Sequence, residues 1–175
     1  MKPWLPSLCS SQSGAVAVEF ALVFPILLTL YFGSFEVTRV VNANTRVANT
    51  AQTVADLVAQ QTAVSNAMTS NYCTGGQLVM MPFASSPLSA TIASVTHYAA
   101  GISVDWQDTT CGSATSISNA TTLASSVVPN VGDSVIIVKA NYSYTSPISY
   151  VLSASFTLSQ TAFSRPLKSS QVTHS

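Results

Sequence analysis

Charged residues are scarce in this chain. Lys, Arg, Asp and Glu make up only 7% of its 175 residues, against about 25% in an average soluble domain. The formal net charge is zero and the six cations are scattered, so no basic patch of the kind that binds nucleic acid is present. Apolar residues still make up 47%, which argues against disorder. The composition is typical of a protein that lies beyond a membrane and packs against other proteins.

Histidine and recognisable catalytic motifs are also scarce. The two histidines, His97 and His174, do not stand in a zinc-binding spacing with cysteine. Serine is so abundant that a Ser–His–Asp set with His97 and Asp105 or Asp108 arises by chance. The sequence has no phosphate-binding loop, HExxH or paired-carboxylate motif. We therefore expect no catalytic, cofactor or metal site, and an anchored enzyme is a remote alternative.

Only three cysteines are present, at Cys9, Cys73 and Cys111. Cys73 and Cys111 lie in polar, turn-rich surroundings beyond an apolar run, where an oxidising compartment would favour a disulfide between them. A bridge closing a loop of roughly 40 residues would contribute about 3–4 kcal/mol through chain entropy. The alternative is two unpaired thiols. Cys9 follows Leu8 and no apolar stretch precedes it, so we reject a lipoprotein attachment site.

One long apolar run is present near the N-terminus. Residues 14–33 read GAVAVEFALVFPILLTLYFG, and no charge occurs from Phe20 to Phe35. The 21 residues of 15–35 match the roughly 20 that a helix needs to cross a bilayer. The run is too long for the core of a cleaved secretory signal. We expect residues 15–35 to be a transmembrane helix with a mild kink at Pro25, preceded by a leader over 1–14.

A single carboxylate, Glu19, lies near the start of this run, five positions after Gly14. A carboxylate in the membrane interior costs about 2.5–3.5 kcal/mol. A chain that keeps one there therefore tends to use it. The alternative is that Glu19 lies at headgroup depth and is simply solvated.

Residues 36–70 contain no Gly or Pro and are predicted to extend the helix beyond the membrane. Residues spaced alternately by three and four, from Val37 to Met68, form a heptad-like stripe that is apolar at its N-terminal end and fades after Val58. This stripe packs either on the chain's own globular part or as a seam against neighbouring subunits. Glu36 and Arg39 are three positions apart just past the apolar run, and we expect them to form an intrahelical pair at the membrane interface.

The pattern changes after Asn71. Glycine and proline predict loops at Gly75, Gly76, Pro82 and Pro87. Alternation of period two then predicts half-buried strands over 91–99, 102–106, 136–144 and 154–158. We expect an antiparallel sheet with one face on the core, a β-rich domain over 71–168 and a tail over 169–175. The fold class is therefore α+β, with a long membrane-spanning helix that continues into a small, pilin-like sheet domain.

The apolar run resembles the N-terminal motif of the TadE/TadG-like family, the minor pseudopilins of bacterial tight-adherence (Flp-type) pilus systems. The TadE-like motif spans 14–56, and its matching positions are Gly14, Ala15, Val18, Glu19, Phe20, Ala21, Leu22, Pro25, Leu27, Leu28 and Gly33. Family members usually carry Arg or Lys just before the Gly, where this chain has Ser-Ser-Gln-Ser. The length is closer to TadE than to the TadG proteins that carry an added domain.

The resemblance implies a pseudopilin that acts by subunit packing. A prepilin peptidase would cut between Gly14 and Ala15, and Glu19 and Phe20 would serve assembly. The Glu19 carboxylate would rest on the positive end of the helix macrodipole or pair with the new α-amino group of Ala15 on an adjacent subunit.

The resemblance also implies where the chain lies and what it contacts. The partners are membrane lipid, the prepilin peptidase, other pilus and pseudopilin subunits and the inner-membrane assembly platform. The location is the bacterial inner membrane, single-pass, with a cytoplasmic N-terminus and a periplasmic C-terminal domain. The basic residues, Lys2 before the run and Arg39 and Arg46 after it, weakly favour the opposite orientation. The alternative function is an uncleaved, single-pass scaffold protein of the same secretion apparatus.

Overall fold

A computed structural model of the chain describes residues 13–147 and 155–175. Most of the expected leader, with Cys9, lies outside the described residues. The elements follow in the order α1 (Ser13–Ala59), β1 (Ala63–Val64), α2 (Asn66–Val79), β2 (Leu88–Tyr98), β3 (Gly101–Cys111), α3 (Ala120–Ala124), β4 (Ser134–Thr145), β5 (Ser155–Ser164) and β6 (Thr173–His174). The predicted α+β class, a long N-terminal helix followed by an antiparallel sheet, is confirmed.

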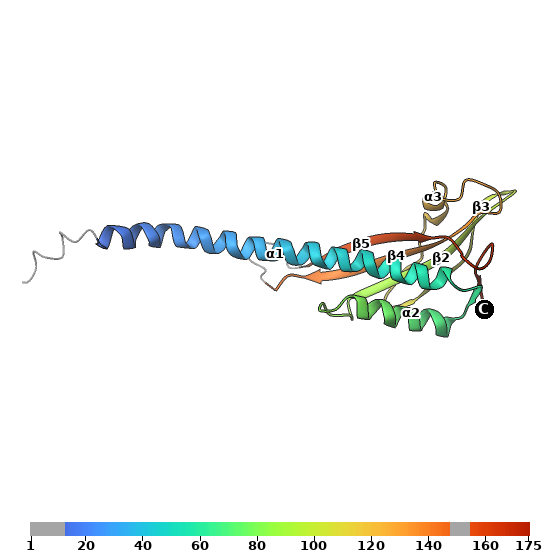
Figure 1. Cartoon of the computed structure of the whole chain (residues 1–175), viewed down its shortest axis with the longest axis horizontal. Helices are drawn as coiled ribbons and strands as arrows, with labels where there is room; N and C mark the ends of the chain where they lie inside the picture. Colours follow the sequence, from blue (N-terminus) through green and yellow to red (C-terminus); the bar gives the residue numbers. More distant parts are fainter. Residues whose placement is uncertain (1–12, 148–154) are drawn as a thin grey trace, which may run out of the picture.

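The first helix has two halves with different surroundings. α1 contains 47 residues, which corresponds to about 70 Å at 1.5 Å per residue. Its first half projects away from the rest of the chain, and its second half lies along β4 and β5 (Figure 1). All residues of 14–32 are exposed, whereas Val47, Val54 and Val58 are at most 1% exposed. The stripe on residues 47–58 therefore packs on the chain's own domain.

The sheet has the strand order β3-β2-β4-β5, and all neighbouring strands are antiparallel. Each of the four predicted strands is present, with bounds that differ by a few residues. The expectation of a single buried face was too simple, because residues 134–138 of β4 are buried without alternation. One face of the sheet meets α1 and α2. The other is covered at one end by α3 and its flanking segments, through Ile117, Ala120, Ala124 and Val128.

The predicted continuous helix over 36–70 was wrong beyond Ala59, where α1 ends before a separate helix, α2, begins at Asn66. Backbone pairing with the C-terminal segment replaces it: Leu167 N–H donates to the Ala59 carbonyl at 2.9 Å, and β1 pairs in parallel with β6. These long-range bonds end the helix where the sequence offers no Gly or Pro. They also correct the predicted tail over 169–175, since Val172 is fully buried and its carbonyl accepts a hydrogen bond from Trp106 Nε1 at 2.7 Å.

The predicted loop at Gly75 and Gly76 was also wrong, because both residues lie inside α2. Gly76 is buried where α2 crosses α1, and a Cβ at this position would lie 2.9 Å from Thr50 Cγ2. The glycine therefore permits close approach of two helices and does not mark a turn.

A disulfide joins Cys73 of α2 to Cys111 at the end of β3. The two Cα atoms are 5.5 Å apart, within the range that an unstrained backbone allows. The bridge fastens α2 to the edge strand of the sheet.

Candidate functional site

The exposed first half of α1 is the candidate functional surface. Among the described residues, one helix is long and apolar enough to cross a membrane by length and composition, and no part of its most apolar window is buried in the chain. Val16, Leu22 and Leu30 are 65–69% exposed. A continuous apolar surface of this kind marks a membrane or protein contact. Residues 14–35 thus have the properties of a single membrane anchor.

Hydroxyl groups within and just after this segment bond to the helix itself. Thr29 Oγ1 donates to the Pro25 carbonyl at 2.9 Å, and Ser34 Oγ donates to the Tyr31 carbonyl at 2.9 Å. Thr38 Oγ1 repeats this bond to the Ser34 carbonyl at 2.8 Å. Because a bilayer offers no water to exposed polar groups, internal bonds of this type make the segment compatible with lipid. The helix continues through Pro25 without interruption.

The residues expected to be processed and to act in assembly lie in the first turns of α1. Gly14, Ala15, Glu19 and Phe20 are all exposed. Ala15 and Glu19 are four positions apart and therefore on one helix face. A Cβ added at Gly14 would meet no described atom within 4 Å. Glycine is thus not required at position 14 by packing within the described chain, in contrast to Gly76.

A second group of residues marks the point where the anchor meets the domain. Glu36 is 0% exposed, and Ser146 Oγ at the end of β4 donates to its Oε2 at 2.7 Å. Glu36 Oε1 and the Tyr144 hydroxyl are buried without a hydrogen-bond partner among the described residues. Burial raises the pKa of the Tyr144 hydroxyl, the nearby Glu36 carboxylate raises it further, and the charge of Arg39 opposes both.

Arg39 faces two aromatic rings at this junction. Its guanidinium carbon is 5.9 Å from the ring centroids of Phe35 and Phe83, a cation–π distance. Glu36 thus contacts the end of β4, whereas Arg39 contacts the loop after α2. The predicted ion pair between Glu36 and Arg39 stays a prediction. The Glu36–Ser146 contact was not predicted from the sequence, since it joins residues 110 positions apart.

Acidic side chains elsewhere have structural partners. Asp108 in β3 accepts hydrogen bonds from the Thr69 and Thr110 hydroxyls, and His174 Nε2 lies 3.6 Å from its Oδ2. Burial alone would raise the pKa of Asp108, but the hydrogen bonds from Thr69 and Thr110 and the nearby His174 imidazole hold it below its usual value. Across residues 14–147 and 155–175, no cluster of three His, Cys, Asp or Glu side chains that could hold a metal is found.

Comparison with known families places the N-terminal part of the chain beside a described family. Residues 14–56 match the family model described as TadE-like protein. The matched region contains the whole exposed half of α1 and most of its packed half, including Gly14, Ala15, Glu19, Glu36 and Arg39. The resemblance seen in the sequence is therefore confirmed. Comparisons with curated proteins and with solved structures found no match.

Proposed function

The TadE-like segment and the N-terminal apolar helix fit a Tad pilus-associated membrane protein, and on this premise we propose that this chain acts as a pseudopilin. In this role the chain is anchored by residues 15–35 and works by packing against other subunits. The observation that carries the proposal is the exposed apolar half of α1, which bears Glu19 and is matched by the family model. The TadE-like family is structural, and we propose no enzymatic step.

Processing would convert the chain into an assembly-competent subunit. A prepilin peptidase cuts between Gly14 and Ala15, and this is supported by a glycine that no described contact requires. Without a Cβ, the backbone can approach a protease closely. The cut gives Ala15 a free α-amino group, and Glu19 of a neighbouring subunit pairs with it. Such a pair would offset the cost of a carboxylate in the membrane.

The cysteine pair and the polar domain support one orientation of the chain in the membrane. A disulfide between Cys73 and Cys111 favours an oxidising compartment. We therefore place the domain in the periplasm, residues 15–35 in the bacterial inner membrane and the N-terminus in the cytoplasm. Lipid, the peptidase, other pilus subunits and the assembly platform are the partners in this arrangement.

Packing between subunits would extend above the membrane along α1. Val37 and Val41 are 54% and 58% exposed on the part of the helix that follows the anchor. Phe20, near Glu19, is 61% exposed and its ring centroid is 5.3 Å from that of Phe24. These side chains supply an apolar surface for neighbouring helices, in line with the seam considered from the sequence.

Mass spectrometry of the protein from its host tests processing. We expect an N-terminus at Ala15 in the wild type and an uncut chain in Gly14→Val, which should fold normally because no described atom lies within 4 Å of a Cβ there. An uncut wild-type chain would contradict the pseudopilin role and favour the alternative, an uncleaved scaffold protein of the same apparatus.

Glu19→Ala tests the assembly role of the carboxylate. Membrane insertion should stay intact because the substitution makes the helix more apolar, whereas pilus production should be lost. Ser34→Ala in the same helix is the control and should leave piliation unchanged, since the Ser34 side chain bonds to its own backbone. Normal piliation in Glu19→Ala would show that the carboxylate is merely tolerated.

A further inference from the structure

A groove opens beside α1 just beyond the anchor. Its volume is about 490 Å³, and its lining residues are Phe35, Arg39, Asn42, Arg46, Pro82 and Phe83. Four of these come from one face of α1, because they are spaced by three or four positions. The opposite wall is the loop between α2 and β2. The end of α2 and this loop lie on the anchor side of the domain (Figure 1).

The charge in this groove has one sign. Two of the chain's six Lys and Arg residues line it, and no carboxylate does. Glu36, the acidic residue nearest in sequence, is fully buried and accepts the hydrogen bond of Ser146. Arg46 is exposed and donates to the Val79 carbonyl at 3.4 Å. A guanidinium has five N–H donors, so both arginines retain capacity for a ligand.

The end of the groove nearest the anchor, at Phe35 and Arg39, lies at the depth of the headgroup layer. Arg39 lies four residues beyond Phe35, about 6 Å along the helix, and a headgroup layer is roughly 5–8 Å thick. Arg46 lies about 10 Å further along the helix, above this layer, and its long side chain reaches back toward the headgroups because helical side chains lean toward the N-terminus. Leu78 and Met81, which flank the loop wall, are 65% and 63% exposed. Apolar and cationic side chains thus lie together at the depth where a phospholipid has its acyl chains next to its phosphate.

We propose that this groove binds the phosphate group of an anionic phospholipid. Arg39 and Arg46 hold the phosphate, since guanidinium groups bind it in a bidentate manner, and the Asn42 amide donates a further hydrogen bond. Phe35 and Met81 contact the apolar part of the lipid. Lipid binding here requires insertion of residues 15–35 and is independent of cleavage at Gly14 or of pilus assembly.

Native mass spectrometry of the full chain in detergent tests this site, with phosphatidylglycerol and phosphatidylcholine of identical acyl chains as probes. We expect preferential retention of one phosphatidylglycerol. Arg46→Gln should weaken this retention by about fivefold and Arg39→Gln with Arg46→Gln by about 25-fold, the effect of one cation each near a lipid surface. Arg46→Lys should keep part of the preference.

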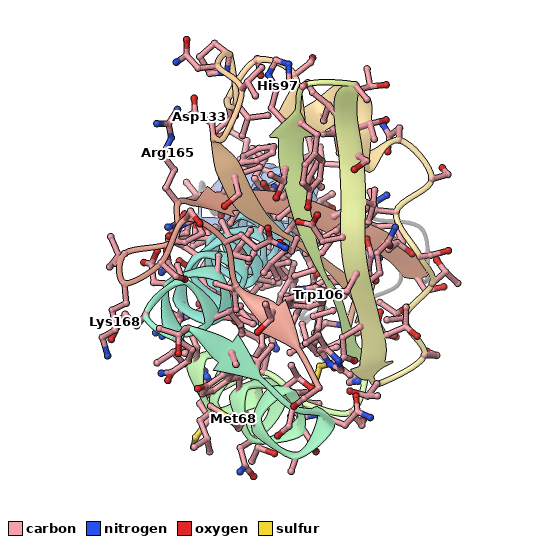
Figure 2. All side chains as sticks on the ribbon, turned by 90° about the vertical axis from the view of Figure 1, so that its right-hand side faces the viewer. Met68, His97, Trp106, Asp133, Arg165 and Lys168 are labelled. Carbon is pink, nitrogen blue, oxygen red and sulfur yellow. A yellow bond between two sulfur atoms is a disulfide. The ribbon has the colours of Figure 1, made fainter. Side chains whose placement is uncertain are left out.

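Arg165→Gln is the matched control. Arg165 lies at the end of the domain remote from the anchor, where it faces Asp133 (Figure 2) at 3.9 Å. Loss of the same size in this variant would overturn the proposal, because general charge would then explain binding. If Arg39→Gln fails to fold, as judged by circular dichroism, Arg46→Gln alone decides.

Three further outcomes would overturn the assignment. Equal retention of the two lipids by the wild type would show that the arginines do not select a headgroup. Displacement of the lipid by millimolar inorganic phosphate would show a site for the free anion. Loss of a co-purifying acidic protein, instead of lipid, in the arginine variants would show a protein interface. Resistance to carbonate extraction reports insertion separately, so failure of the lipid site and failure of the membrane anchor are distinguishable.

Discussion

Gly76 shows how one missing side chain fixes the packing of two helices. A Cβ at this position would lie 2.9 Å from Thr50 Cγ2 and 3.1 Å from Val54 Cγ2, and Thr50 Oγ1 donates to the Gly76 carbonyl at 3.2 Å. Gly75, the preceding residue in α2, has open space at the same point. Substituting the two glycines in turn therefore distinguishes the steric cost of a Cβ from the gain in helix propensity.

We expect Gly76→Ala to lower the free energy of unfolding by about 1–3 kcal/mol, the usual cost of overpacking. Gly75→Ala should raise it by roughly 0.5–1 kcal/mol, because alanine favours the helix and meets no neighbour. Thermal unfolding of the full chain in detergent, followed by circular dichroism, measures both. A stabilised Gly76→Ala variant would contradict the close approach of α1 and α2.

Asp108 links stability to pH. Its hydrogen bonds hold the pKa below the ordinary value despite burial, so the unfolded state takes up a proton at a higher pH than the folded state. The carboxylate therefore stabilises the fold at every pH above its unfolded pKa of about 3.9. This contribution is lost as the pH falls through the lower, folded-state pKa.

We expect Asp108→Asn to melt at a lower temperature than the wild type near pH 6, with a difference that narrows progressively as the pH falls below about 4. Melting curves between pH 3 and 7 would show this. Asp56→Asn on the surface of α1, where Asp56 accepts a hydrogen bond from Gln52 at 2.9 Å, is the control and should show no comparable trend. A constant difference for Asp108→Asn across this range would mean that the lost charge is not the cause.

Among the elements, those with a strong local pattern were predictable and those formed by distant pairing were not. The period-two runs gave all four strands of the main sheet, because alternation in β3 or β5 reflects a face that each strand carries by itself. The end of α1 at Ala59 depends on backbone bonds to residues near the C-terminus. Those partners are more than 100 positions away, so no local signal marks them.

The disulfide is the element-level link with the largest expected effect on stability. It joins α2 to β3 across a sequence separation of 38. Replacing both Cys73 and Cys111 by Ala should lower the free energy of unfolding by about 3–4 kcal/mol, since the unfolded chain gains entropy when the loop opens.

Alkylation followed by peptide mapping gives an independent check of the bridge. Peptides that contain Cys73 or Cys111 should be labelled only after reduction, while the Cys9 peptide of an uncleaved chain serves as the internal control. Labelling of Cys73 without reductant would contradict the disulfide.

For the molecule as a whole, the anchor and the core do not overlap. The buried residues of both hydrophobic clusters lie at Ala43 or beyond, with Val40 packed against the first cluster, and Glu36 is the first buried residue of α1. We therefore expect a chain that begins at Ser34 to remain folded and soluble without detergent, with Ser34 as a favourable helix N-cap.

Circular dichroism, size-exclusion chromatography and mapping of the disulfide measure this outcome. A melting temperature in water close to that of the full chain in detergent would support two independent units on one helix. Aggregation or loss of the Cys73–Cys111 bridge in the shortened chain would show that residues 14–33 contribute to folding.

The candidate surface has two parts, the anchor and its junction with the domain, and the sequence predicts the first better than the second. Gly14, Ala15, Glu19 and the apolar run form a continuous segment, so both their pattern and their family resemblance can be read directly. The junction residues Glu36 and Arg39 were noted as a pair, but their surroundings come from β4 and from the loop after α2. Only the folded chain brings these segments together.

The continuity of α1 has a geometric consequence. Each residue of an α-helix advances the chain by 1.5 Å and turns it by about 100°. The orientation of the β-sheet about the helix axis, relative to the anchor, is therefore set by the number of residues between Glu19 and Val47. One residue inserted between Phe35 and Ala43 would rotate the whole domain by about 100° around the helix axis relative to the anchor. A neighbouring subunit that binds one face of the anchor will therefore contact one particular side of the domain.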